Sequence, residues 1–246
     1  MRKLLTVIVA IIAMFVPAMC VAESGKDEGT VRGSQSVGLV LSGGGAKGIA
    51  HIGVIRALED ADIPIDYVCG TSMGAIVGGL YSAGYTTDEM LDLILSKGFS
   101  YWSTGKIDPS LCYNFTMPEP TPALFSFNVG GKADSIQNAV PASLISPIPM
   151  NFAFMELFAG FTAQTGGDFD SLMVPFRCVA SDVAAHRKVV LGHGSLGDAI
   201  RSSMSFPAVF QPTKFDGMLL YDGGIYDNFP VDVMRSTFAP DVMIGV

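Results

Sequence analysis

Two glycine-rich loops, each set between a short apolar run and a helical pattern, constrain the fold of this chain more than any other feature. The first apolar run is Val37 to Leu41, which is followed by three consecutive glycines, and the second is Ile65 to Cys69, which leads into Gly70. Apolar residues at helical spacing follow each loop, over Ile49 to Asp60 and over Ala75 to Ala83. Strand, helix, strand and helix with short connections predict a βαβα unit, and runs that are apolar throughout are typical of parallel strands covered on both faces. We therefore expect an α/β fold with a mainly parallel central sheet and helices on both faces.

The same alternation returns in the last third of the chain. A helix is predicted after the first unit with Thr87 as its N-cap, and Asp216-Gly217 is typical of a tight hairpin turn. The last predicted strand has nothing after it, so we expect the native chain to continue past Val246. The further predicted elements are helices over Asp88–Leu95, Leu196–Ser203 and Pro230–Arg235, and strands over Phe176–Ala180, Lys188–Leu191, Met218–Tyr221 and Asp241–Val246.

The composition excludes several classes of protein. Apolar residues make up 49% and charged residues 15% of the chain, whereas intrinsically disordered chains combine low hydrophobicity with high charge. The formal net charge of -8 argues against nucleic acid as a partner, because phosphate neutralisation needs clustered Lys and Arg. Cys69 and Cys178 lie in apolar runs, where they predict small buried side chains and no bridge. No His/Cys cluster has the spacing of metal ligands, so neither a metal nor an organic cofactor is expected.

The first 22 residues have the layout of a secretory signal peptide. Arg2 and Lys3 precede an uncharged, largely apolar run from Leu4 to Val16, and the small residue Ala22 fits a cleavage site. The run is short for a membrane span, which needs about 20 apolar residues. We therefore predict an exported protein with a signal peptide over 1–22, a flexible leader over 23–36 and one domain over 37–246.

The second loop has the pattern of a nucleophile elbow. Gly70-Thr71-Ser72-Met73-Gly74 is a G-x-S-x-G sequence between a predicted strand and a predicted helix, the context that gives this pattern its meaning. Such a turn is so sharp that side chains at Gly70 and Gly74 would collide with their surroundings. Ser72 would stand at the N-terminus of the helix, whose dipole and free N–H groups stabilise developing negative charge. The alternative is a glycine turn in which Ser72 only caps the helix.

The first loop, Gly43-Gly44-Gly45-Ala46-Lys47-Gly48, permits two interpretations. By itself it matches G-x-G-x-x-G and indicates a dinucleotide site, with Asp62 or Asp66 as the acid expected about 20 residues later. Beside a nucleophilic serine it predicts an oxyanion hole, because glycine lets the backbone N–H groups approach a ligand closely. Only the second interpretation also explains the serine loop. The N–H groups expected to form the hole are those of Gly43, Gly44, Gly45 and Met73.

A base for Ser72 is the next requirement. Asp222 ends a predicted strand and is followed by Gly223 and Gly224, which places a carboxylate at a strand end with room around it. A plain Asp-Gly turn is the alternative for this sequence.

The histidines offer other bases. A triad of the loop serine with Asp182 and His193 would have the chain order of α/β-hydrolases. His51 lies early in a predicted helix, and His186 and His193 flank an apolar run in a polar setting, as ordinary packed or loop residues do. Asp222 is therefore the stronger candidate.

Together these motifs resemble the patatin-like phospholipases. The likeness covers about residues 37–98 and 175–246, and it implies a three-layer α/β sandwich that hydrolyses acyl lipids. It further implies a Ser-Asp dyad with Ser72 as nucleophile and Asp222 as base, in which no histidine takes part. The segments that carry the resemblance are Gly43–Gly48, Gly70–Gly74, Ile200–Pro207, Phe210–Pro212, Asp222–Gly224 and Asn228–Val231.

The resemblance also implies partners and supporting residues. A phospholipid or other acyl lipid would be the substrate, and a membrane surface would supply it. Signal-bearing bacterial members can carry a carboxyl-terminal outer-membrane barrel, so the periplasm, the outer membrane or secretion is the expected location. Lys47 stands where many members have Arg, which keeps the charge but loses the bidentate fork. The supporting residues are Lys47, Gly48, Gly70, Gly74, Gly223 and Gly224.

The middle region, Phe99 to Ser171, lies outside that likeness. Its clearest pattern is an apolar helix over Met150 to Phe161. A helix that is apolar all round is usually buried, so a core helix is one interpretation. The other is a lid or acyl-chain groove next to Ser72, because long acyl chains need an apolar trench. The residues assigned to that lid are Met150, Phe154, Phe158 and Phe161.

Three classes of function stay open. A lipid acyl hydrolase working through an acyl-enzyme explains both glycine loops and is the reading we favour. An esterase or thioesterase on soluble acyl substrates would use the same residues. A non-catalytic lipid-binding or nucleotide-binding module would not need Ser72 as a nucleophile.

Overall fold

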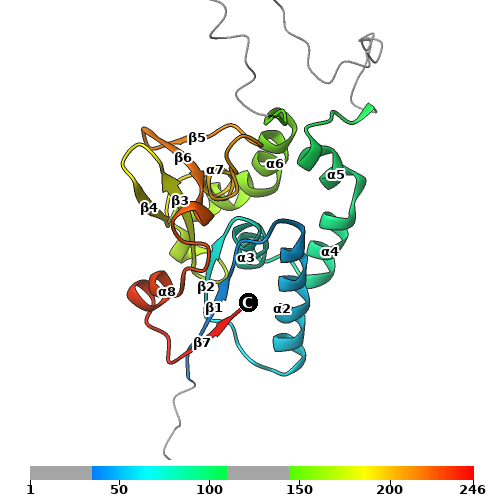
Figure 1. Cartoon of the computed structure of the whole chain (residues 1–246). Coiled ribbons are helices and arrows are strands. Elements are labelled where there is room, and N and C mark those ends of the chain that lie inside the picture. Colours follow the sequence, from blue (N-terminus) through cyan, green and yellow to red (C-terminus); the bar gives the residue numbers. More distant parts are fainter. Residues whose placement is uncertain (1–34, 110–143) are drawn as a thin grey trace, which may run out of the picture. The chain divides into compact units, whose positions relative to one another are not determined.

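The computed structural model describes residues 35–109 and 144–246, and these build a seven-stranded mixed sheet (Figure 1). The strand order is β5-β6-β3-β2-β1-β7, and β4 pairs with β3 off this path. The predicted signal peptide and most of the predicted leader lie outside the described residues. The strands are β1 Val37–Leu41, β2 Tyr67–Thr71, β3 Phe176–Asp182, β4 Arg187–Leu191, β5 Thr213–Phe215, β6 Met218–Asp222 and β7 Val242–Gly245.

The helices connect these strands in the predicted alternation. The α-helices are α2 Ala50–Asp60, α3 Met73–Ala83, α4 Thr87–Leu95, α5 Lys97–Thr104, α6 Ile148–Thr165, α7 Leu196–Ser203 and α8 Val231–Thr237. Short 3-10 helices are η1 Gly45–Ile49, η4 Phe169–Ser171 and η5 Gly223–Ile225. Among the described residues, no helix is both long and apolar enough to cross a bilayer.

The sheet combines a parallel half with an antiparallel half. Strands β7, β1, β2 and β3 run parallel, whereas β4 and β6 pair antiparallel with β3, and β5 with β6. Thr71 at the end of β2 lies opposite Val179 on β3, and Asp222 at the end of β6 lies opposite Ala180. Strand β3 therefore brings the ends of β2 and β6 to the same level of the sheet.

Helices cover both faces of the sheet, as predicted. Successive strand residues point to opposite faces, so neighbours along β1 enter different cores. Leu39 and Leu41 join the larger core with α2, α3, α6 and α7, whereas Val40 packs with Val233 and Met234 of α8 on the other face. Figure 1 shows α8 apart from α2 and α3, with the strands between them. This layering confirms the α/β prediction.

The two described cysteines are buried, as expected. Cys69 belongs to the core under α8, while Cys178 belongs to the larger core on the opposite face. Burial raises the pKa of the Cys69 thiol to about 12. Both therefore act as small apolar side chains.

Local turns follow their residues, with one correction. Gly84 ends α3 in the left-handed conformation, and Asp216 and Gly217 both have positive φ, as a tight hairpin between β5 and β6 requires. The N-cap of α4 is Thr86 and not the predicted Thr87. Thr86 accepts from the N–H of Glu89, whose carboxylate accepts from the N–H of Thr86, and this reciprocal capping box favours the earlier threonine.

Helix α6 is a core helix, which makes the lid assignment wrong. Met150, Phe154 and Phe158 are at most 2% exposed and belong to the larger core, and Phe161 is partly buried against it. The large exposed apolar residues of this helix are Ile148, Phe152 and Met155. The sequence pattern could not separate the two because apolar side chains occur on both faces. The rest of the predicted variable region, residues 110–143, lies outside the described residues.

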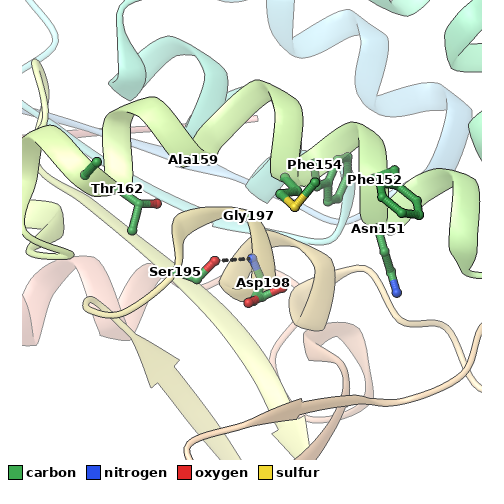
Figure 2. A pocket seen from close by; sticks show the side chains of 10 residues that line it. Asn151, Phe152, Phe154, Ala159, Thr162, Ser195, Gly197 and Asp198 are labelled. Atoms are coloured by element: carbon green, nitrogen blue, oxygen red, sulfur yellow. Dashed lines mark hydrogen bonds between the residues drawn. The ribbon is translucent and has the colours of Figure 1, made fainter.

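Close packing of α6 against α7 explains this burial (Figure 2). A Cβ atom at Gly197 would lie 2.8 Å from the carbonyl oxygen of Phe154, so glycine lets the two helices approach. The hydroxyl of Thr162 accepts from the N–H of Leu196 at 3.1 Å. A cavity of about 490 Å³ lies along this seam, between Phe152 and Met155 on one side and the start of α7 on the other.

Candidate active site

Ser72 occupies a strained turn between β2 and α3. Its backbone has φ 54° and ψ -118°, a region that non-glycine residues rarely adopt. A Cβ atom at Gly70 would lie 2.3 Å from the carbonyl oxygen of Gly74, and one at Gly74 would lie 2.3 Å from that of Leu41. Both glycines are therefore required by the sharpness of the turn, as the elbow pattern predicts.

The Ser72 hydroxyl points at Asp222. Ser72 Oγ donates to Asp222 Oδ2 at 2.7 Å, although the two residues are 150 positions apart in the sequence. No N–H group of α3 donates to the Ser72 hydroxyl, so Ser72 does not cap this helix with its side chain. Ser72 directly precedes the first turn of α3, so the positive end of the helix dipole lies at the elbow.

Asp222 is held from three directions. Its N–H donates to the carbonyl oxygen of Ser205 at 2.9 Å, and its Oδ1 accepts from the N–H of Gly224 at 2.7 Å. Gly223 packs against β3, where a Cβ atom would lie only 2.2 Å from the carbonyl oxygen of Val179. Burial raises the pKa of the Asp222 carboxyl, and its hydrogen bonds from Ser72 and Gly224 partly oppose this shift. A raised pKa makes this carboxylate a stronger base than an exposed aspartate.

The first glycine loop lines one cavity together with Ser72 and Asp222. The cavity has a volume of about 370 Å³ and is lined by Gly43, Gly44, Gly45, Ser72, Phe206, Asp222, Gly224, Ile225 and Asn228. Phe206 and Ile225 are its large apolar side chains, 59% and 43% exposed. The two glycine loops and the Asp-Gly-Gly loop, which the sequence keeps far apart, therefore meet at one site.

The three glycines of this loop differ in what their N–H groups do. Gly43 donates its N–H to the carbonyl oxygen of Asn228 at 3.0 Å, so it is not free to join an oxyanion hole in this conformation, contrary to the prediction. The side chain of Asn228 donates back to the carbonyl oxygen of Gly43 at 3.1 Å. Among the described residues, the N–H groups of Gly44 and Gly45 donate no hydrogen bond. Gly43 thus anchors the loop while the next two glycines remain open to the cavity.

The residues after these glycines shape the loop from behind. A Cβ atom at Gly48 would lie 2.3 Å from Cγ of Met73, so glycine is needed where the two loops touch. His51 is buried, and its Nε2 is 2.9 Å from the carbonyl oxygen of Ser42, to which it donates. Burial lowers the pKa of His51, so the ring is neutral at physiological pH. Lys47 is exposed, and no described carboxylate pairs with it.

The alternative triad does not assemble. His193 is exposed and its Nε2 lies 3.3 Å from Asp216 on the β5–β6 hairpin. The carboxylate of Asp182 accepts from the N–H of Ala185 at 3.0 Å. Neither residue joins the cavity beside Ser72, whose hydroxyl is already bonded to Asp222.

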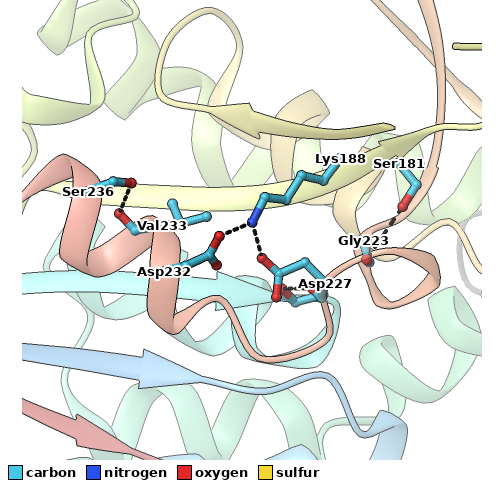
Figure 3. A network of polar contacts seen from close by, with 8 residues as sticks. Ser181, Lys188, Gly223, Asp227, Asp232, Val233 and Ser236 are labelled. Carbon is cyan, nitrogen blue, oxygen red and sulfur yellow. Dashed lines mark hydrogen bonds and ion pairs between the residues drawn. The ribbon is translucent and has the colours of Figure 1, made fainter. Parts of the chain in front are cut away.

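Sequence reasoning missed a charged network behind the Asp222 loop (Figure 3). Lys188 on β4 reaches across to Asp227 at 2.8 Å and also bonds Asp232 on α8. The backbone of Asp227 is tied in turn to the elbow, because its carbonyl oxygen accepts from the hydroxyl of Thr71 at 3.0 Å. These residues carry no local pattern, so only the folded chain reveals them.

A second missed residue is Ser203, at the end of α7. Its Oγ accepts from the N–H of Ser72 at 2.9 Å and donates to the carbonyl oxygen of Val179 at 2.6 Å. In the sequence, its segment Ile200–Pro207 stands out only through the family resemblance. The pattern itself does not show that a helix-terminal serine contacts the elbow.

Comparison with known proteins extends this picture. Lysophospholipase NTE1 of Mycosarcoma maydis is 33% identical over 213 residues, which cover 84% of this chain and 10% of that protein. An uncharacterized NTE family protein of Mycobacterium bovis is 34% identical over 218 residues, covering 88% of this chain and 50% of that protein. This chain therefore spans half or less of the length of these relatives.

The fold comparison and the family comparison agree. The crystal structure of VipD from Legionella pneumophila has a TM-score of 0.50 and 17% sequence identity, covering 80% of this chain and 47% of that one, a likeness that concerns the fold. The model of the family described as patatin-like phospholipase matches residues 39–118 and 160–235, more than half of the chain. The chain belongs to the patatin-like phospholipase family.

Proposed function

We propose that this chain is a serine lipid acyl hydrolase that works through Ser72 and Asp222. The observation that carries the proposal is the 2.7 Å hydrogen bond from Ser72 Oγ to Asp222 Oδ2 at a strained elbow. Acyl transfer needs a nucleophile, a base within hydrogen-bond reach of it, and N–H groups that can donate to the oxyanion. The cavity beside Ser72 offers candidates for each. Family membership agrees with this chemistry and favours a lipid ester as substrate.

The reaction has two halves. Ser72 Oγ attacks the ester carbonyl carbon while Asp222 takes the hydroxyl proton, and the protonated carboxyl then gives this proton to the departing alcohol. Asp222 then takes a proton from the water that attacks the acyl-enzyme and gives it to Ser72 Oγ as the acyl–oxygen bond breaks, which releases the fatty acid and restores the enzyme. The N–H groups of Gly44, Gly45 and Met73 would stabilise the oxyanion in both halves.

The substrate is proposed from the cavity wall and the relatives. Phe206 and Ile225 present apolar surface next to Ser72, where an acyl chain would lie. One relative is named a lysophospholipase, so a single-chain phospholipid is the first substrate to try. The segment 1–22 supports an exported location, where membrane lipid is at hand.

Hydrolysis of a lysophospholipid tests the proposal. The purified chain should release fatty acid from micelles, and Ser72→Ala should lower kcat by at least about a thousand-fold because the nucleophile is lost. Fatty acid release by Ser72→Ala at the wild-type rate would contradict it. The esterase alternative is tested by comparing two substrates. The lysophospholipid is assayed below and above its critical micellar concentration, and a soluble short-chain ester is assayed beside it. A lipid hydrolase should be faster on the micelles, whereas an esterase should favour the soluble ester.

A further inference from the structure

The last residue of α7 and the segment just after it contact the backbones of both residues of the proposed dyad. Ser203 Oγ accepts the N–H of Ser72 at 2.9 Å, and the carbonyl oxygen of Ser205 accepts the N–H of Asp222 at 2.9 Å. The two acceptors are only two positions apart in the chain. One short segment thus fixes the positions of the nucleophile and the base relative to each other.

The Ser203 hydroxyl both accepts and donates a hydrogen bond at this position. The residue is 0% exposed, and its hydroxyl donates to the carbonyl oxygen of Val179 at 2.6 Å while it accepts from Ser72. Gly223 packs directly against that same carbonyl oxygen. Ser203 therefore joins the elbow to the point on β3 where the Asp222 loop is seated.

The strain at Ser72 requires such a partner. A residue at φ 54° and ψ -118° stays there only when its surroundings hold it. The N–H of Ser72, which is partly buried, would lose this acceptor if the Ser203 hydroxyl were removed. A shielded N–H without an acceptor favours a change of backbone conformation. Such a change would rotate Oγ away from Asp222.

We propose that Ser203 is a positioning residue for acyl transfer, which holds Ser72 in the elbow conformation and aligns its Oγ with Asp222. This inference rests on the proposed function of Ser72 and Asp222. It predicts a loss in kcat with little change in KM, because Ser203 lies behind the elbow and does not line the cavity. Displacement of a reacting group by about 1 Å costs on the order of 100-fold in rate.

The neighbouring Ser202 provides a matched control. It is also 0% exposed, and its hydroxyl donates to the carbonyl oxygen of Asp198 at 2.7 Å within α7, away from the dyad. Ser203→Ala and Ser202→Ala therefore remove the same atoms from equally buried positions of one helix.

The experiment compares kcat, KM and Tm of the two variants with the wild-type chain on a lysophospholipid. Ser203→Ala should lower kcat by roughly 10- to 100-fold at unchanged KM, and Ser202→Ala should keep kcat near wild type. Equal kcat in the two variants, or losses that follow Tm alone, would overturn the positioning role. If either alanine variant does not fold, the variants Ser203→Cys and Ser202→Cys replace the pair. Cysteine keeps nearly the same volume but is only a weak acceptor. The same difference in kcat between the two positions is expected, and its absence would overturn the positioning role.

The proposed function fails in a different way. An inactive wild-type chain, or an active Ser72→Ala variant, would refute the dyad itself. A wild-type chain that needs Ser72 but tolerates Ser203→Ala as well as it tolerates Ser202→Ala would refute only the positioning role.

Discussion

Replacement of Gly223 by alanine tests how tightly the Asp222 loop is seated on the sheet. A Cβ atom there would lie 2.2 Å from the carbonyl oxygen and 2.8 Å from the carbonyl carbon of Val179, whereas real Cβ atoms essentially never come closer than 3.0 Å. Both contacted atoms belong to the backbone of β3, which is paired on both sides. The sheet cannot give way easily, so the loop must move by most of an ångström.

A movement of this loop also displaces Asp222, because Asp222 directly precedes Gly223 in the chain. It would change the 2.7 Å separation between Ser72 Oγ and Asp222 Oδ2. A misplacement of about 1 Å costs on the order of 100-fold in rate, and a methyl group forced into a packed site costs about 1–3 kcal/mol of stability. In a chain of this size, each kcal/mol lowers Tm by roughly 2–4 °C.

The assay measures kcat on a lysophospholipid and Tm by calorimetry for Gly223→Ala and for a control, Gly160→Ala. Gly160 lies on α6, and nothing described in the structure lies within 4 Å of a Cβ atom added there. The control should keep wild-type kcat and gain up to about 1 kcal/mol of stability, because alanine favours a helix over glycine. A Gly223→Ala variant with wild-type kcat would refute the close seating of the loop.

Further predictions concern burial and charge. Burial raises the pKa of the Asp222 carboxyl, so the folded state binds this proton more tightly than the unfolded state and loses stability as the pH rises between the two pKa values. Asp222→Asn should therefore raise Tm at neutral pH while it abolishes turnover, and wild-type kcat should rise with pH as the carboxylate ionises; an unchanged or lower Tm would contradict the first part. Phe158→Ala should lower the free energy of unfolding in urea by about 3–5 kcal/mol, whereas the exposed Phe152→Ala should change it by less than about 0.5 kcal/mol; similar values would contradict the core assignment of α6. Lys188→Met should lower kcat, because Lys188 holds the loop that contains Asp227. The exposed neighbour Arg187→Met should leave kcat unchanged, and equal kcat values for the two variants would contradict a catalytic effect of this network.

The glycine loops could be predicted because their geometry demands particular residues. Gly70 and Gly74 are spaced around Ser72 for a steric reason that any sequence reader can apply, and their contacts in the structure confirm it. The bounds of α7 agree with the prediction, and α3 ends at Ala83 as predicted, where the left-handed Gly84 follows it. Turns and helix bounds that depend on a few neighbouring residues can therefore be predicted from the sequence alone.

Contacts between distant segments could not be predicted in the same way. The N–H of Gly43 is engaged by Asn228, and nothing near Gly43 in the sequence indicates this partner. Ser203 and Lys188 likewise owe their positions to neighbours on other elements. For α6, periodicity predicts the helix but does not show which of its apolar faces is covered, so the lid interpretation places Phe158 wrongly and its side chain belongs to the core.

Labelling with a fluorophosphonate, followed by mass spectrometry, tests the central claim most directly, because this reagent modifies only an activated serine. The account predicts one label per chain, on Ser72, with Ser72→Ala unlabelled and Asp222→Asn labelled at least about 100-fold more slowly, since the base that activates the hydroxyl is lost. A label on another serine, or an Asp222→Asn variant that reacts at the wild-type rate, would contradict the assignment of Ser72 and Asp222 as nucleophile and base.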